Sequence, residues 1–158
     1  MADAILVAGT AAPKFKLASS TGSAVDLADL LGKKPVVLYF YPKADTPGCT
    51  KQACGFSDAI ASYQKIGVPV FGISPDPEKA VTKFAEKFKL NFPLLADEDH
   101  AIAEKFGVWQ EKSMYGKKYM GVARTTFIIG PDGKIAHVFE KVKPEGHDQE
   151  VLEKLKSM

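Results

Sequence analysis

The stretch PVVLYFYPKADTPGCTKQACGFSDAIASYQK, residues 35–65, contains a strand, a loop and a helix in direct succession. Residues 35–41 are continuously apolar and rich in β-forming side chains, which is typical of a central strand covered on both faces. Pro42 ends this strand, because a proline has no N–H to donate to a sheet. Apolar side chains then recur at helical spacing over 50–65, so we expect a helix that begins near Cys49.

The same alternation continues outward from this stretch. We expect further strands over 68–76 and 92–97, further helices over 77–90, 99–107 and 145–158, and two strands within 124–142 joined at a Pro-Asp-Gly turn. Asp99 is the expected N-cap and Gly107 the expected end of the helix over 99–107. Upstream, residues 14–27 suggest a short hairpin, followed by a brief helix through 29–31 that stops at Gly32.

Strand–helix units followed by a strand–strand–helix ending predict an α/β fold. More specifically, we expect a thioredoxin-like fold: a mixed central β-sheet flanked by helices on both faces, with an N-terminal hairpin. The length of 158 residues suits one compact domain, so residues 1–158 are interpreted as a single domain.

Composition narrows the classes of function. The 21 basic and 19 acidic side chains leave a net charge of +2, too small and too evenly spread to predict a nucleic-acid partner. The most basic stretch, 115–124, is interpreted as a solvated loop. No apolar run is long enough to cross a bilayer, so we expect no membrane partner. The start of the chain lacks the basic region of a signal peptide, which favours the cytoplasm.

Cys49 and Cys54 are the only two cysteines, and in a reducing compartment such thiols are reduced, metal-bound or catalytic. A helix N-terminus offers free N–H groups and a partial positive charge, both of which favour thiolate over thiol at Cys49. Arg124, the single arginine, would add to this effect if it lay nearby; alone, it would be interpreted as a surface charge. Pro42 and Thr46 lie in the preceding loop, where the alternative is an ordinary turn capped by Thr46.

The spacing of the two thiols sets a geometric condition. Five residues along a helix give a rise of ~7.5 Å and a rotation of about 140°. A disulfide tolerates Cα separations only up to ~6.8 Å and needs converging Cβ atoms. Cys49 and Cys54 therefore cannot pair on one intact helix, and a bridge would require its first turns to unwind. The alternative is that Cys54 is a small buried apolar residue.

Other functions remain open at this stage. A general thiol–disulfide oxidoreductase would suit a cysteine at a helix start, although such proteins use the C-x-x-C spacing. A non-enzymatic binding or holdase module would make both thiols incidental. Metal binding is disfavoured, because two cysteines with His100 far along the chain do not compose a tetrahedral site. His137, His147 and Trp109 are interpreted as structural or solvated.

Pro42, Thr46 and Cys49 form a P-x-x-x-T-x-x-C motif, and FYPKADTPGCTKQAC resembles the Q-type, or bacterioferritin comigratory protein, branch of the peroxiredoxins. Similar flanks run from AAPKFKL through VPVFGISPDP and FPLLADED to RTTFIIGPDGKI, so the resemblance covers nearly the whole chain. It implies a thiol-dependent peroxidase that reduces hydrogen peroxide and organic hydroperoxides in antioxidant defence, with no metal or organic cofactor.

The resemblance also implies roles for individual residues. Cys49 would be the peroxidatic cysteine and Cys54 the resolving one, forming an intramolecular disulfide that thioredoxin or a similar dithiol reduces. Thr46 and Arg124 would hold the peroxide oxygens, and Pro42 would shield the sulfur. The branch is usually monomeric.

Two features of the chain differ from common family patterns. Ser57 stands where relatives often carry arginine. The GGLG loop and C-terminal Tyr-Phe helix of peroxide-sensitive members are absent, so we predict that Cys49 resists overoxidation to sulfinic acid.

Overall fold

The computed structural model describes residues 4–158 of the chain. The elements are β1 (Lys16–Leu17), β2 (Val25–Asp26), the 3₁₀ helix η1 (Leu27–Leu30), β3 (Val36–Phe40), α1 (Pro47–Lys65), β4 (Val70–Ser74), α2 (Glu78–Lys87), β5 (Leu94–Ala96), α3 (Ala101–Lys105), β6 (Trp109–Met114), β7 (Lys117–Val122), β8 (Thr125–Ile129), β9 (Ile135–Phe139) and α4 (His147–Lys156).

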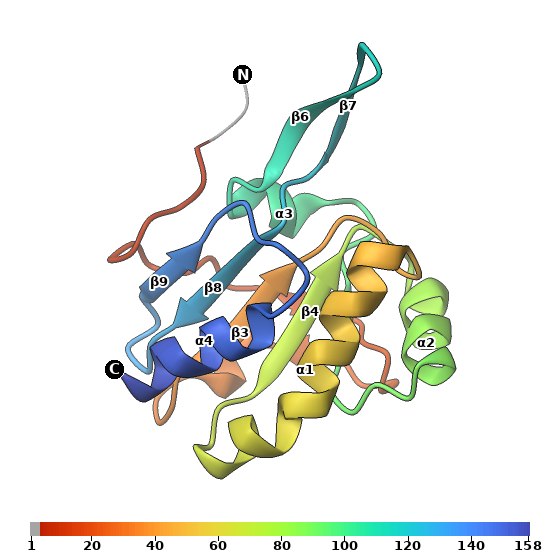
Figure 1. The fold of residues 1–158 in the computed structure, drawn as a ribbon. Coiled ribbons are helices and arrows are strands. Elements are labelled where there is room, and N and C mark those ends of the chain that lie inside the picture. The colour runs from red at the N-terminus through yellow and green to blue at the C-terminus, as the bar shows by residue number, and fades with distance from the viewer. Residues whose placement is uncertain (1–3) are drawn as a thin grey trace.

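The central sheet has five strands in the order β5-β4-β3-β8-β9 (Figure 1). β3, β4 and β5 run parallel, whereas β8 runs antiparallel to both β3 and β9. The parallel half comes from the strand–helix units and the antiparallel half from the Pro-Asp-Gly hairpin. The expected mixed sheet is therefore confirmed.

Every residue of β3 is buried, because both faces of the sheet are covered. Val37 and Tyr39 point into a core shared with α1, α2 and α4, while Leu38 and Phe40 point into a second core shared with α3, η1 and the N-terminal segment. On the first face Phe56 of α1 stacks on Tyr39, with 4.7 Å between ring centroids. The expected helices on both faces are confirmed.

Helix α1 begins immediately after the loop that follows β3. Thr46 is extended, with φ −105° and ψ 155°, and Pro47 is the first helical residue. Proline suits this position because its fixed φ is helical and its missing N–H would have had no partner there. The helix therefore starts three residues before Thr50, and Cys49 lies within its first turn.

The N-terminal hairpin is present but short, since β1 and β2 pair over only two residues each. The expected brief helix lies over Leu27–Leu30 rather than 29–31, and it is a 3₁₀ helix. The side chain of Asp26 explains the earlier start, because its carboxylate accepts a hydrogen bond from the N–H of Ala28.

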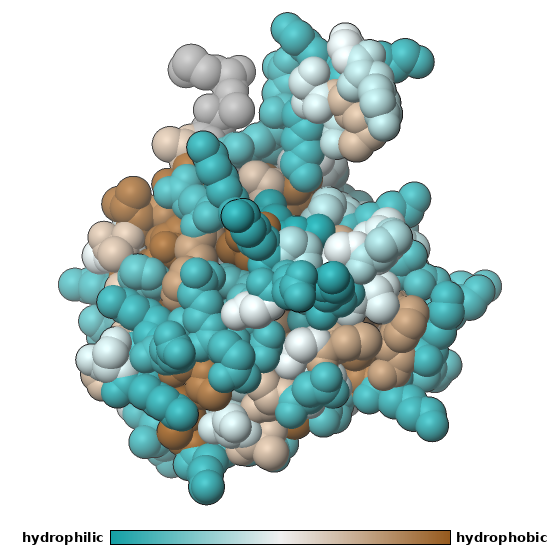
Figure 2. Space-filling model, viewed as in Figure 1, coloured by the Kyte–Doolittle hydropathy of each residue, from teal (hydrophilic) through white to brown (hydrophobic). Residues whose placement is uncertain are grey.

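The interpretation of residues 115–124 as a loop is wrong, although most of them are exposed to solvent as expected. Most of them form β7, which pairs antiparallel with β6, and Trp109 at the start of β6 is opposite Val122. In Figures 1 and 2 this hairpin projects from the body of the molecule. The two strands of this hairpin, β6 and β7, bury few side chains. The alternation of apolar and polar residues that identifies a strand in a sequence is therefore missing.

The N-cap of α3 also differs from the expectation. His100, with a left-handed φ of 51°, takes that position instead of Asp99. The buried carboxylate of Asp97 accepts the N–H groups of Ile102 and Ala103 at 3.1 and 2.8 Å, whereas Asp99 accepts only that of Ala101, at 3.2 Å. Asp97 reaches the first turn because the chain bends between β5 and α3.

Within residues 4–158 no helix combines the length and apolar character that a membrane span requires.

Candidate active site

Cys49 lies at the end of the sheet where β3 delivers the chain to α1. It is the third residue of the helix and is 1% exposed. The backbone N–H groups of a first helical turn have no carbonyl partner within the helix, so the sulfur sits beside free donors and the positive end of the helix dipole. Both features stabilise negative charge on the sulfur.

Arg124, just before β8, contacts this sulfur. Its Nη2 donates to Sγ of Cys49 at 3.4 Å. Gly48 eases the approach, because a Cβ there would make tight contacts of 3.3 Å with the same Nη2 and 3.4 Å with Pro144. A guanidinium cannot lose its proton in a protein, so the cysteine faces a permanent positive charge. The structure thus brings together two residues that are 75 positions apart.

Gln52 is a site residue that the sequence did not reveal. It is 1% exposed, and its Oε1 accepts from Nη1 of Arg124 at 2.5 Å. Gln52 therefore fixes one half of the guanidinium while the other half faces Cys49. The available signal was spacing, because residues three apart on a helix share a face.

The loop of residues 42–46 is held by contacts to α2 and the loop after β4. The N–H of Ala44 donates to Asp76 at 2.8 Å, and Lys87 pairs with Asp45 at 2.9 Å. Asp45 adopts a left-handed φ of 58°. The hydroxyl of Thr46 donates to the carbonyl of Lys43 at 2.9 Å, so its oxygen keeps lone pairs that can accept from a substrate O–H.

The two cysteines lie on one continuous helix, as expected, and both are free thiols. Cys54 is half-buried, and burial, followed by the Asp58 carboxylate, raises the pKa of its thiol. Of the predicted site residues, Cys49 and Arg124 are in contact, Pro42 and Thr46 lie in the loop before α1, and Cys54 lies further along the helix.

The histidines take no part in this site. His100 stacks on Trp109 with 3.9 Å between ring centroids. His147 is buried beside α1 and bonds Thr126 and Glu150. His137 lies in β9, as expected. Among the residues that the structure describes, no group of three or more His, Cys, Asp or Glu side chains is arranged to hold a metal ion.

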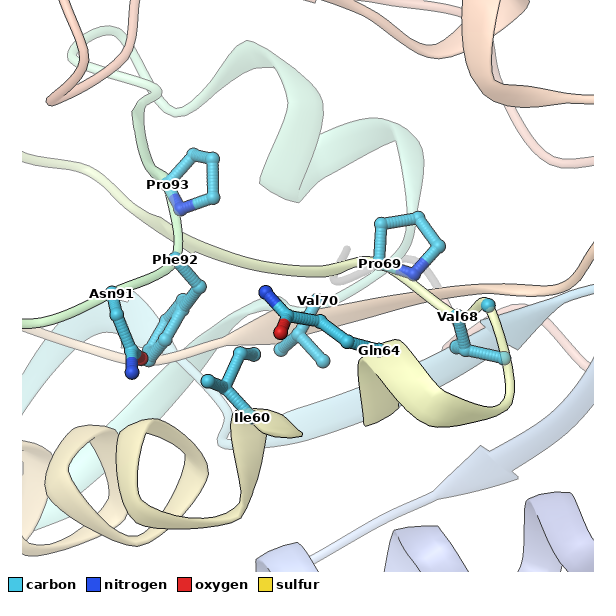
Figure 3. A pocket seen from close by; sticks show the side chains of 9 residues that line it. Ile60, Gln64, Val68, Pro69, Val70, Asn91, Phe92 and Pro93 are labelled. Atoms are coloured by element: carbon cyan, nitrogen blue, oxygen red, sulfur yellow. The ribbon is translucent and has the colours of Figure 1, made fainter. Parts of the chain in front are cut away.

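An apolar hollow of about 350 Å³ lies elsewhere, near the end of α1 and the starts of β4 and β5 (Figure 3). Cys49 follows the carboxyl end of β3. Because β3, β4 and β5 are parallel, the hollow lies at the opposite end of these strands from Cys49. The residues that line it, Ile60, Gln64, Gly67, Val68, Pro69, Val70, Asn91, Phe92 and Pro93, include no titratable side chain. It offers no group for thiol or acid–base chemistry.

Comparison with known proteins identifies the family. The model of the AhpC/TSA family matches residues 8–138. Peroxiredoxin Bcp of Escherichia coli K12 is 52% identical over 151 residues, which cover 96% of each chain. A solved peroxiredoxin Q of Xanthomonas campestris superposes with a TM-score of 0.87 at 34% identity and 99% coverage of both chains.

The bacterioferritin comigratory protein of the same organism, solved in work on its alkyl peroxide reduction activity, has a TM-score of 0.86 at 34% identity and 98% coverage of both chains. These likenesses confirm the expected thioredoxin-like fold. With a family model spanning most of its length and a relative sharing half of its residues, this chain belongs to the AhpC/TSA family and, within it, to the Bcp peroxiredoxins, which are thiol peroxidases.

Proposed function

We propose that the chain reduces hydrogen peroxide and organic hydroperoxides through Cys49 and serves antioxidant defence. The contact between Arg124 and the buried Cys49 sulfur, at the start of a helix, is the observation that carries this proposal. It supplies the two things a peroxidatic cysteine needs: a stabilised thiolate and a cation facing the oxygen that leaves. The alkyl peroxide activity of the X. campestris relative supports organic hydroperoxides as substrates.

In the first step the Cys49 thiolate attacks one oxygen of the hydroperoxide. The S–O bond forms, the O–O bond breaks, and the departing alkoxide or hydroxide takes a proton from solvent. Cysteine sulfur is oxidised to sulfenic acid, and the peroxide is reduced to alcohol or water. Arg124 stabilises the charge on the leaving oxygen, Thr46 accepts from the peroxide O–H, and Pro42 shields the sulfur.

In the second step Cys54 resolves the sulfenic acid. Its sulfur attacks that of Cys49, an S–S bond forms and water leaves. Because both residues lie on α1, the helix has to unwind between them before the sulfurs can meet. Thioredoxin or a similar dithiol then reduces the bridge by thiol–disulfide exchange and returns both cysteines to thiols.

This cycle needs only one chain, since both thiols belong to the same helix. We therefore propose a monomer that forms one domain over residues 1–158, and its continuous central sheet supports the single domain. Two free thiols suit a reducing compartment, which supports the cytoplasm. The small, evenly spread net charge supports the absence of nucleic-acid and membrane partners.

The test is to mix reduced protein with one equivalent of hydrogen peroxide and follow its mass and free thiols. We expect rapid loss of two thiols and a mass decrease of ~2 Da, as an intramolecular disulfide requires. Cys49→Ser abolishes the reaction, and Cys54→Ser stops at the sulfenic acid. The denatured chain is the control: if the folded protein reacts no faster, Cys49 is not activated and the proposal fails.

A further inference from the structure

Lys112 is a half-buried lysine on the projecting hairpin, in the strand β6. The base of this hairpin adjoins the candidate active site, because the N–H of Ala123 bonds the carbonyl of Val108 at 2.8 Å and Arg124 follows directly. In Figure 1 the hairpin rises from the end of the molecule where α1 begins. A long side chain on the face of β6 that carries Lys112 can therefore extend toward Cys49.

The strand register shows which way the Lys112 side chain extends. Lys112 pairs with Tyr119, and Gln110 pairs with Gly121, so Gly121 is the diagonal neighbour of Lys112 on the side of the hairpin base. A Cβ at Gly121 would lie 3.5 Å from Cδ and 3.8 Å from Cε of Lys112. The stem of the lysine thus crosses β7 over Gly121 and heads toward Arg124.

The charges around Lys112 are consistent with a side chain that extends toward Arg124 and Cys49. Burial and the Arg124 guanidinium lower the pKa of Lys112, while the Cys49 sulfur acts in the opposite direction. On the hairpin itself, Lys117, opposite Met114, shares the face of Lys112 but is exposed, and Glu111 and Lys118 pair with each other at 3.6 Å. Both residues of this pair lie on the other face of the hairpin, because side chains alternate along a strand.

We propose that Lys112 is a second cation of the peroxidatic site, which acts with Arg124 to hold Cys49 as a thiolate. The proposal rests on the proposed function of Cys49. Arg124 divides its guanidinium between two partners: Nη1 donates to Gln52 and Nη2 to the Cys49 sulfur. Only Nη2 therefore contacts the sulfur. An ammonium group in the same half-buried space adds to the field at the sulfur without touching it. Lys112 is in this sense a positioning residue.

The test measures the ultraviolet absorbance of the Cys49 thiolate against pH in a Cys54→Ser background, where only one thiol remains. Lys112→Met is expected to raise the pH midpoint of this absorbance by roughly half a unit to one unit, a three- to tenfold loss of thiolate below the midpoint. Lys112→Arg restores most of the shift, because it keeps the charge.

Two further variants separate the charge from structural effects. Lys117→Met removes an equally positive but exposed side chain from the same hairpin, and we expect almost no shift because solvent screens that charge. Gly121→Val keeps the lysine but fills the space that its stem occupies, so the midpoint rises. In a Lys112→Met background the same valine has no further effect.

A midpoint in Lys112→Met equal to that in Lys117→Met overturns the proposal, as does a Gly121→Val shift that persists without the lysine. Lys112→Gln gives the same test if the methionine variant does not fold. Because thiolate absorbance needs no turnover, failure here is distinct from failure of the proposed function, which peroxidase activity in Cys49→Ser would reveal.

Discussion

Among single residues, Gln52 holds the guanidinium of Arg124 that contacts the Cys49 sulfur. Replacing this glutamine by leucine keeps the buried volume but removes the acceptor for Nη1 of Arg124. Hydrogen bonds to charged groups contribute ~1.5–3 kcal/mol, so we expect Gln52→Leu to slow the reaction with peroxide roughly tenfold or more. Stopped-flow kinetics with hydrogen peroxide measure this rate.

The matched control is Gln64→Leu, an exposed glutamine further along the same helix, which should leave the rate unchanged. Equal rates for Gln52→Leu and the unmodified chain would show that Arg124 needs no such anchor.

Residue chemistry alone identified Cys49 and Arg124 as candidates, since one lies at a predicted helix start and the other is the single arginine. Gln52 and Lys112 could not be predicted from residue chemistry, for a physical reason. Each acquires its importance only from a partner that the fold brings near: Arg124 for Gln52, and the space over Gly121 for Lys112.

In the proposed cycle, the stability of the helix α1 controls how often Cys54 can reach Cys49. Gly55 lies inside this helix, where glycine is ~1 kcal/mol less favourable than alanine. A Cβ there would lie 2.8 Å from Oδ1 of Asp148, the free end of a side chain that can turn aside. Gly55→Ala should make unwinding rarer by roughly fivefold and prolong the sulfenic acid.

Trapping of the sulfenic acid by a dimedone probe, followed by mass spectrometry, measures this lifetime. Ser62→Ala is the control, because it also favours the helix but lies eight residues beyond Cys54, whereas the helical hydrogen bond of the Gly55 N–H reaches back into the segment between the two cysteines. A shorter sulfenic acid lifetime in Gly55→Ala would contradict the requirement for unwinding.

The cap of α3 gives a second prediction for an element. Asp97 accepts two N–H groups of the first turn, whereas Asp99 accepts one from an exposed position. We expect Asp97→Ala to lower the free energy of unfolding by ~1–2 kcal/mol and Asp99→Ala by a few tenths. Urea denaturation compares the two variants, and equal losses would restore Asp99 as the cap.

The element order was predictable because buried strands and amphipathic helices leave clear periodic patterns. The hairpin of β6 and β7 was not, since most of its side chains face solvent and the alternation that identifies a strand is absent. Its pairing comes from backbone hydrogen bonds, which carry no mark in side-chain polarity.

For the molecule as a whole, His147 couples stability to pH. As the first residue of α4, it is buried against Thr126 of β8 and Phe56 of α1, and burial lowers its pKa despite the opposing effect of Glu150. The unfolded chain therefore binds a proton more readily than the folded one. We expect the free energy of unfolding to fall as pH decreases below ~6.5, the ordinary value for histidine, until the lower folded pKa is passed.

Urea denaturation between neutral and mildly acidic pH measures this slope. His147→Gln should reduce it. His137→Gln should reduce it less, because His137 is less buried although its pKa is also lowered. A slope unaffected by His147→Gln would show that other groups carry the pH dependence.

The stack of Phe56 on Tyr39 has a further consequence for how quickly the proposed enzyme recovers between substrates. Phe56 lies two residues beyond Cys54, so it can keep the rest of α1 docked on the sheet while the segment between the cysteines is undone. Once the disulfide between Cys49 and Cys54 is reduced, the unwound residues between them refold onto the remaining part of α1. Starting a helix is the rare event, with a nucleation constant of about 10⁻³, whereas lengthening one takes on the order of nanoseconds per residue. In the proposed cycle we therefore expect re-formation of the first turns of α1 to be too fast to limit turnover.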